Sequence, residues 1–254
     1  MPLDAATGIH YTLHGNGQPL LIGLPLMASH TALFGPESAA MLNGYLDPLT
    51  DRYRVLLVDY PSIGGSRDIA PQDLTAERVC ADLLGVATAA GFDRFAYWGY
   101  SWGGAVGLQL AARTDRLSAL VIGGWPPLAG PYEALLAAAR KKLPQPEPSS
   151  MKVLRSPAQY AQWITFYESL RGWNERESVA RLACPRMVYF GAQGDLIEAG
   201  IPVSIASHIR GERDTLEALG WTVQEIAGRD HGGAALPDAV VPPVRAFLDR
   251  SLGA

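Results

Sequence analysis

Short apolar runs alternate along the chain with segments whose apolar residues are spaced three or four positions apart. Near-continuous aliphatic and aromatic runs are typical of strands buried on both faces, and the wider spacing is typical of amphipathic helices. This alternation predicts a parallel sheet whose strands are joined by right-handed helical crossovers. The predicted strands are residues 19–22, 53–59, 92–98, 117–123, 186–190 and 222–226.

Turn and capping residues delimit several of the predicted elements. Residues 9–13 alternate loosely and the turn residues 14–17 follow them, which predicts a hairpin leading into the strand at 19–22. Thr75 is placed to cap a helix that Gly91 ends. The other helices predicted for the sheet region are residues 37–49, 101–113, 202–219 and 240–252.

The alternation of strands and helices breaks after the strand that ends at residue 123. Prolines there separate three helical patterns, which we interpret as a helical cap inserted into an α/β core. The predicted core is residues 1–124 and 180–254, and the predicted cap is residues 125–179. The cap helices are expected at residues 132–143, 157–170 and 174–182.

The composition narrows the classes of function. The chain has 254 residues, and its 21 basic and 25 acidic residues give a net charge of −4, which argues against binding to nucleic acid. Cys80 and Cys184 are too few for a disulfide scaffold and lie too far apart in the sequence for a metal motif. We interpret them as buried structural thiols and expect no metal site.

The pattern at the N-terminus also bears on location. The first residues lack a charged segment followed by an apolar core, so no secretory signal is predicted. No apolar stretch approaches the ~20 residues that cross a bilayer. We therefore expect a cytoplasmic protein that does not span a membrane. Its oligomeric state is not predicted by the sequence.

The segment Gly99-Tyr100-Ser101-Trp102-Gly103 is the main candidate for chemistry. It forms a G-x-S-x-G motif at the point where a predicted strand must turn sharply into a helix, which holds the serine hydroxyl above the strand end. The glycines remove side chains that would collide across such a turn. The backbone N–H of Trp102 would then face a developing oxyanion. The alternative is a glycine-rich turn with an incidental serine.

A serine nucleophile needs a histidine base and a carboxylate that orients it. Of five histidines, His231 follows the last predicted strand in a glycine-flanked loop, at the same sheet edge as Ser101. A merely exposed loop histidine is the alternative. Asp195 follows the preceding strand and gives the chain order Ser, Asp, His. Glu198 and Asp230 remain alternatives for the acid.

These residues resemble the α/β-hydrolase superfamily over nearly the whole chain. Residues 99–104 look like its nucleophile elbow, residues 53–66 look like a core strand with a D-x-P-x-x-G-x-S ending, residues 191–195 look like its acid turn, and His231 looks like its histidine loop. The resemblance implies an eight-stranded, mostly parallel sheet with a helical cap after the sixth strand. It also implies that no cofactor is needed.

One departure from the family pattern concerns the second oxyanion donor. Family members commonly carry His-Gly after the first buried parallel strand, whereas this chain has Ile22-Gly23-Leu24-Pro25-Leu26. Proline has no N–H, so the backbone donor would be Leu24, or Leu26 if the loop is shifted. His30 nearby is a candidate for the pocket lining, with a structural role as the alternative.

The cap region is rich in aromatic residues, and some of these are expected to line an apolar substrate pocket. The candidates are Trp125, Trp163 and Tyr167. The sequence thus predicts a serine hydrolase that acts on a carboxylic ester or a related small carbonyl substrate, such as a lactone, with an apolar portion. The alternatives are a C–C bond hydrolase or perhydrolase with the same triad, and a catalytically silent ligand-binding protein.

Overall fold

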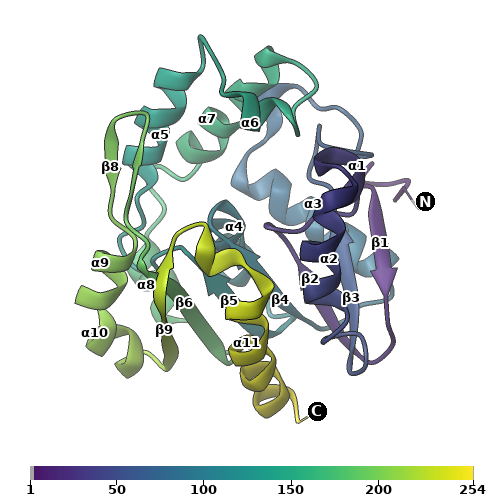
Figure 1. The fold of residues 1–254 in the computed structure, drawn as a ribbon, viewed down its shortest axis with the longest axis vertical. Coiled ribbons are helices and arrows are strands. Elements are labelled where there is room, and N and C mark those ends of the chain that lie inside the picture. Colours follow the sequence, from purple (N-terminus) through teal and green to yellow (C-terminus); the bar gives the residue numbers. More distant parts are fainter. Residues whose placement is uncertain (1–2, 254) are drawn as a thin grey trace.

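The computed structural model describes residues 3–253, and its centre is a seven-stranded sheet (Figure 1). The strand order is β1-β3-β2-β4-β5-β6-β9, with β1 antiparallel to β3 and every other neighbouring pair parallel. The mostly parallel sheet that the sequence predicts is therefore confirmed, with seven strands in the described residues in place of eight. The strands are β1 Tyr11–His14, β2 Gln18–Ile22, β3 Tyr53–Val58, β4 Phe95–Tyr100, β5 Leu117–Gly123, β6 Arg186–Gln193 and β9 Trp221–Asp230.

The hairpin predicted for the first two strands is wrong, because β3 lies between β1 and β2. Tyr11 is paired with Val58, and Leu20 is paired with Val55 from the other side. Residues 20–22 are fully buried, whereas all of β1 is only half-buried. The apolar strand therefore occupies the interior of the sheet and the partly polar strand its edge.

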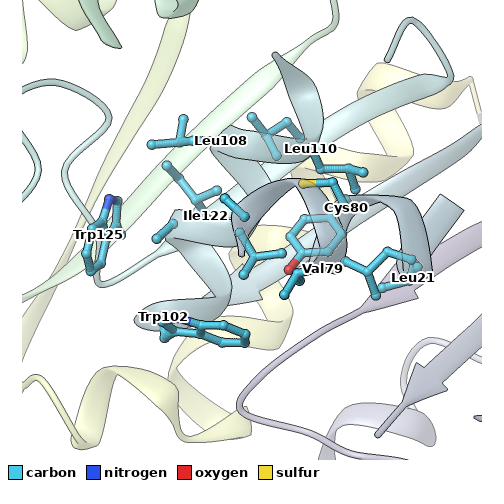
Figure 2. Close-up of a cluster of buried hydrophobic side chains, with 14 of the residues drawn as sticks. Leu21, Val79, Cys80, Trp102, Leu108, Leu110, Ile122 and Trp125 are labelled. Carbon is cyan, nitrogen blue, oxygen red and sulfur yellow. The ribbon is translucent and has the colours of Figure 1, made fainter. Parts of the chain in front are cut away.

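Helices cover both faces of the sheet and create two hydrophobic layers. Successive strand residues point to opposite faces, so Leu21 belongs to one layer and Leu20 and Ile22 to the other. Figure 2 shows part of the layer that contains Leu21, including Val79 and Cys80 of one helix and Leu108 of another. This layer packs on α3 Ala76–Ala89 and α4 Trp102–Ala111, and the opposite layer packs on α2 Ala39–Leu46 and α11 Pro237–Leu252.

Several helix boundaries differ from the sequence prediction. The single helix expected at 202–219 is two short helices, α9 Ala206–Gly211 and α10 Arg213–Ala218. They follow a hairpin of β7 Leu196–Glu198 and β8 Ile201–Val203, which the sequence analysis missed. The sequence signal for this hairpin is the pair Ala199-Gly200, which lies between two short apolar runs. Ala199 and Gly200 both have positive φ, as a tight turn between two strands requires. The predicted cap of α3 is present, because the Arg78 N–H donates to Thr75 Oγ1 at 3.1 Å.

The segment 125–179 contains α5 Tyr132–Lys142, α6 Pro148–Met151, α7 Ala161–Glu168 and α8 Glu175–Ala180, with a 3-10 turn at Pro157–Tyr160; α1 His30–Phe34 follows β2. In Figure 1, α5, α6 and α7 lie at the top, beyond the carboxyl ends of the strands, whereas α8 lies lower. Within residues 3–253, no helix is both long and apolar enough to cross a membrane. Cys80 is buried, whereas Cys184 is only half-buried, and both are free thiols.

The buried carboxylate of Asp59 joins the loops after β2 and β3 to His10, the residue before β1. Asp59 accepts hydrogen bonds from the Ser29 N–H at 2.9 Å, the Ser29 hydroxyl at 2.6 Å and the Gly65 N–H at 2.8 Å. His10 Nδ1 lies 2.8 Å from Asp59 Oδ2. Asp59 is fully buried, so these partners replace the water that it loses on folding. The two hydrogen bonds from Ser29 also fix the end of the loop after β2, which carries Leu24.

We expect Asp59→Ala to lower the free energy of unfolding by about 3–5 kcal/mol, because it leaves buried donors without an acceptor. Urea unfolding followed by circular dichroism measures this change. Asp115→Ala is the matched control, since Asp115 is exposed and should change stability by less than about 0.5 kcal/mol. Equal unfolding midpoints for the two variants would contradict the role assigned to Asp59.

Candidate active site

The turn between β4 and α4 places Ser101 at the carboxyl edge of the sheet. Ser101 has φ 52° and ψ −121°, a strained conformation for a residue with a side chain. A Cβ added at Gly99 would overlap the carbonyl oxygen of Gly103, so the backbone can make this turn only with glycine there. The Ser101 N–H donates to the Gly123 carbonyl at 2.7 Å, which fastens the turn to β5.

His231 meets Ser101 directly. Its Nε2 lies 3.1 Å from Ser101 Oγ, and the residue follows immediately after β9. Tyr100 supports the histidine, because its hydroxyl donates to the His231 carbonyl and its ring lies 5.1 Å from the imidazole centroid. Gly124, with φ 60°, leaves space for the imidazole, because a Cβ at this position would lie 2.9 Å from His231 Cε1. Sequence analysis missed both supporting residues, although Tyr100 occupies a variable position of the G-x-S-x-G motif.

The environment of His231 keeps its imidazole neutral at physiological pH. Burial lowers the pKa of His231 to about 4, and the nearby Asp230 carboxylate only partly opposes this effect. A neutral imidazole whose Nε2 lies near a hydroxyl can accept the hydroxyl proton. The pair Ser101 and His231 therefore has the geometry and the protonation state of a nucleophile and its base.

Asp195, the acid expected from the sequence, has other partners. Its Oδ1 accepts hydrogen bonds from the Ile205 N–H at 2.7 Å and the Ser207 N–H at 3.1 Å, at the start of α9. Burial opposes its ionisation, but the hydrogen bonds from Ser207 and Ile205 outweigh burial and lower the pKa of Asp195. Among the hydrogen bonds of residues 3–253, none joins this carboxylate to the His231 ring.

The two alternative acids are also engaged elsewhere. Glu198 forms an ion pair with Lys142, and Asp230 Oδ1 accepts a hydrogen bond from the Gly233 N–H at 2.6 Å. Asp230 is thus the acid whose charge acts on the His231 pKa, but its own hydrogen bond turns back into the loop. The structure brings Ser101 and His231 together, and within residues 3–253 none of the three candidate acids hydrogen-bonds to the His231 ring.

The backbone around Ser101 has N–H groups that are candidates for oxyanion donors. Trp102 is the first residue of α4, so its N–H has no acceptor within the helix. Of the two candidates in the preceding loop, Leu26 donates its N–H to the Gly23 carbonyl at 3.2 Å. The Leu24 N–H faces the Tyr60 hydroxyl and has no backbone acceptor in the described part of the chain, and the Leu24 carbonyl accepts from the Tyr100 N–H at 2.6 Å. This geometry favours Leu24 over Leu26.

A pocket of about 200 Å³ adjoins Leu24 and Trp102, the two candidate oxyanion residues. Of the four residues expected near a substrate pocket, Trp163 and Tyr167 line this one, whereas Trp125 and His30 do not. Trp125 is buried against Gly104 and Tyr132, at the edge of the cluster in Figure 2, and the buried His30 ring packs 5.0 Å from Phe34. The lining residues are Leu24, Trp102, Leu135, Ala138, Ala139, Lys142, Tyr160, Trp163, Tyr167 and Glu198.

No metal site accompanies these residues in the described range. Between residues 3 and 253, no group of three or more His, Cys, Asp and Glu side chains could hold a metal ion.

Comparison with known proteins places this geometry in a family. Residues 35–196 match the sequence model of the alpha/beta hydrolase fold. RutD of Azorhizobium caulinodans, provisionally named a carbamate hydrolase, is 30% identical over 120 residues, which are 46% of this chain and 41% of that protein. The chain thus matches less than half the length of this relative.

Solved structures agree in fold over almost the whole chain. A thermophilic esterase from Thermogutta terrifontis has a TM-score of 0.71 at 18% identity, covering 98% of this chain and 97% of that chain. An enol-lactonase from Burkholderia xenovorans has a TM-score of 0.68 at 20% identity, covering 94% of this chain and 96% of that chain. Similarity at this level of identity shows a shared fold.

We expect NMR titration of the His231 imidazole to give a midpoint near pH 4, well below that of an exposed histidine. The unfolded chain would bind this proton first as the pH falls below about 6.5, so the contribution of His231 to stability should decline between pH 6.5 and 4. His231→Gln identifies the resonance. A midpoint at pH 6.5 or above would contradict the effect assigned to burial.

Proposed function

Because the chain belongs to the alpha/beta hydrolase fold family, we propose that it is a serine hydrolase that cleaves a carboxylic ester or a related small carbonyl substrate, such as a lactone. The observation that carries this proposal is the 3.1 Å approach of Ser101 Oγ to His231 Nε2 in a strained turn. A protein that only binds ligands would not need a serine held in this conformation beside a neutral histidine.

The proposed reaction follows from the positions of these groups. Ser101 Oγ attacks the substrate carbonyl carbon while His231 Nε2 takes the hydroxyl proton. The carbonyl oxygen becomes an oxyanion that accepts hydrogen bonds from the Trp102 and Leu24 N–H groups. His231 then returns the proton to the leaving alcohol, and a water molecule, activated by the same imidazole, releases the acyl group from Ser101.

We propose Asp195 as the acid that orients His231 and stabilises its charged form. Support comes from its place after β6, in the chain order Ser, Asp, His, and from the two backbone N–H groups that hold Oδ1. Both of these backbone hydrogen bonds end on Oδ1, so neither occupies Oδ2, the oxygen that we propose for a protonated imidazole. Asp195 would thus act when His231 becomes charged during the reaction.

The nature of the pocket supports a substrate with an apolar portion. Eight of its ten lining residues are aliphatic or aromatic, and two of these, Leu24 and Trp102, also carry the proposed oxyanion donors. The similar proteins include an esterase, an enol-lactonase and a protein provisionally named a carbamate hydrolase, and these names fit the proposed substrate class. C–C bond hydrolysis and perhydrolysis would use the same groups, but no specific contact favours them.

A fluorophosphonate probe tests the activated serine without knowledge of the substrate. We expect stoichiometric labelling of the wild type and none of Ser101→Ala, because only an activated hydroxyl displaces fluoride from phosphorus. Ser149→Ala, which changes an exposed serine in the cap region, should label like the wild type. Labelling that persists in folded Ser101→Ala would contradict the proposed nucleophile.

The choice of acid is tested by two isosteric variants. We expect Asp195→Asn to lower kcat for a nitrophenyl ester by more than about 100-fold, because the amide cannot stabilise a charged imidazole. The fold should persist, since asparagine still accepts from Ile205 and Ser207. Asp230→Asn should remain within about threefold of the wild type. The opposite pattern would transfer the role to Asp230.

A further inference from the structure

The pocket beside the oxyanion residues has one charged part in an otherwise apolar lining. Lys142, at the end of α5, and Glu198, in β7, both line it and form an ion pair. The Lys142 side chain is only 11% exposed, and its Nζ also lies 3.0 Å from Glu147 Oε1. The other lining residues are aliphatic or aromatic. Substrate that fills the pocket must therefore meet this charged pair.

The hydrogen-bonding capacity of the pair is not exhausted. A lysine ammonium has three N–H donors, and the two carboxylates take two of them. Glu198 also has a second oxygen beyond the one that contacts Lys142. A substrate group that covers this part of the pocket would leave polar atoms unpaired unless it both donates and accepts hydrogen bonds.

The two charges that line the pocket balance each other, because the Lys142 ammonium is paired with the Glu198 carboxylate. Glu147 and Lys141 lie outside the lining and are exposed, so solvent screens their charges. An additional carboxylate brought by a substrate would leave a net negative charge in the pocket and would be repelled by Glu198.

We propose that this pocket selects acyl groups that end in an uncharged hydrogen-bonding group, such as a hydroxyl, and rejects those that end in a carboxylate. A terminal hydroxyl accepts a hydrogen bond from Lys142 and donates one to Glu198, while the chain before it contacts the apolar wall. Lys142 and Glu198 are thus specificity-determining residues. This inference rests on the proposed function for its substrate class, but the preference itself is a property of binding.

Binding to Ser101→Ala tests the preference without turnover. Quenching of tryptophan fluorescence, to which Trp102 and Trp163 contribute, reports ligands in the pocket. The ligands are alkanamides of six, eight and ten carbons ending in a hydroxyl, a methyl or a carboxylate. We expect the best-fitting hydroxyl ligand to bind about tenfold more tightly than its carboxylate counterpart, with the methyl ligand between them.

Substitutions in the same Ser101→Ala background assign the preference to the pair. Glu198→Lys should reverse the order of hydroxyl and carboxylate ligands, and Glu198→Gln should reduce their difference. Lys141→Met is the matched control and should leave the order unchanged, since its ammonium lies outside the pocket. Equal affinities at all three lengths, tighter binding of the carboxylate to wild-type Glu198, or no change in Glu198→Lys would overturn the proposal.

The nitrophenyl esters of the matching acyl groups then separate this inference from the proposed function. If both hold, kcat/KM with Ser101 present follows the order of the binding constants. Ser101-dependent turnover without a hydroxyl preference would overturn only the specificity. A hydroxyl preference in binding without labelling or turnover at Ser101 would overturn only the hydrolase mechanism.

Discussion

The close approach of two backbone segments at Gly99 and Gly103 is the constraint on which the site depends. Because no Cβ fits at Gly99, the chain can turn from β4 into α4 within a single residue, and that residue takes a positive φ. The same turn is fastened by hydrogen bonds from Ser101 to Gly123 and from Tyr100 to Leu24. The strained conformation of Ser101 persists because the contacts with Gly103, Gly123 and Leu24 together hold the turn in place.

The loop that carries Leu24, the proposed second oxyanion donor, is also held at its far end. Gly103 approaches Leu24 closely, since a Cβ at Gly103 would lie 3.1 Å from the Leu24 carbonyl oxygen. Five residues further on, Ser29 is bound to the buried carboxylate of Asp59. The segment between these contacts cannot shift without breaking hydrogen bonds inside the protein. Backbone donors fixed in this way stabilise charge without a reorganisation cost during the reaction, which is what an oxyanion site requires.

The sequence predicts the sheet and the placement of Ser101 and His231 at one edge because both depend on local patterns. Buried strands are visible as apolar runs, and each loop that follows a parallel strand emerges at the same edge. The partner of Asp195 was not predictable in this way. The N–H groups of Ile205 and Ser207 become available only once α9 has folded against this loop. The position of β1 beyond β3 likewise depends on burial along the whole sheet rather than on the turn at 14–17.

The hairpin of β7 and β8 links three parts of the site that the sequence presents separately. It begins directly after Asp195, it carries Glu198 into the pocket, and it is bound to the end of α5 through Lys141 and Lys142. The residues proposed to select the substrate and the residue proposed to support the base thus share one short piece of backbone, and the contacts of Lys141 and Lys142 hold that piece against the end of α5.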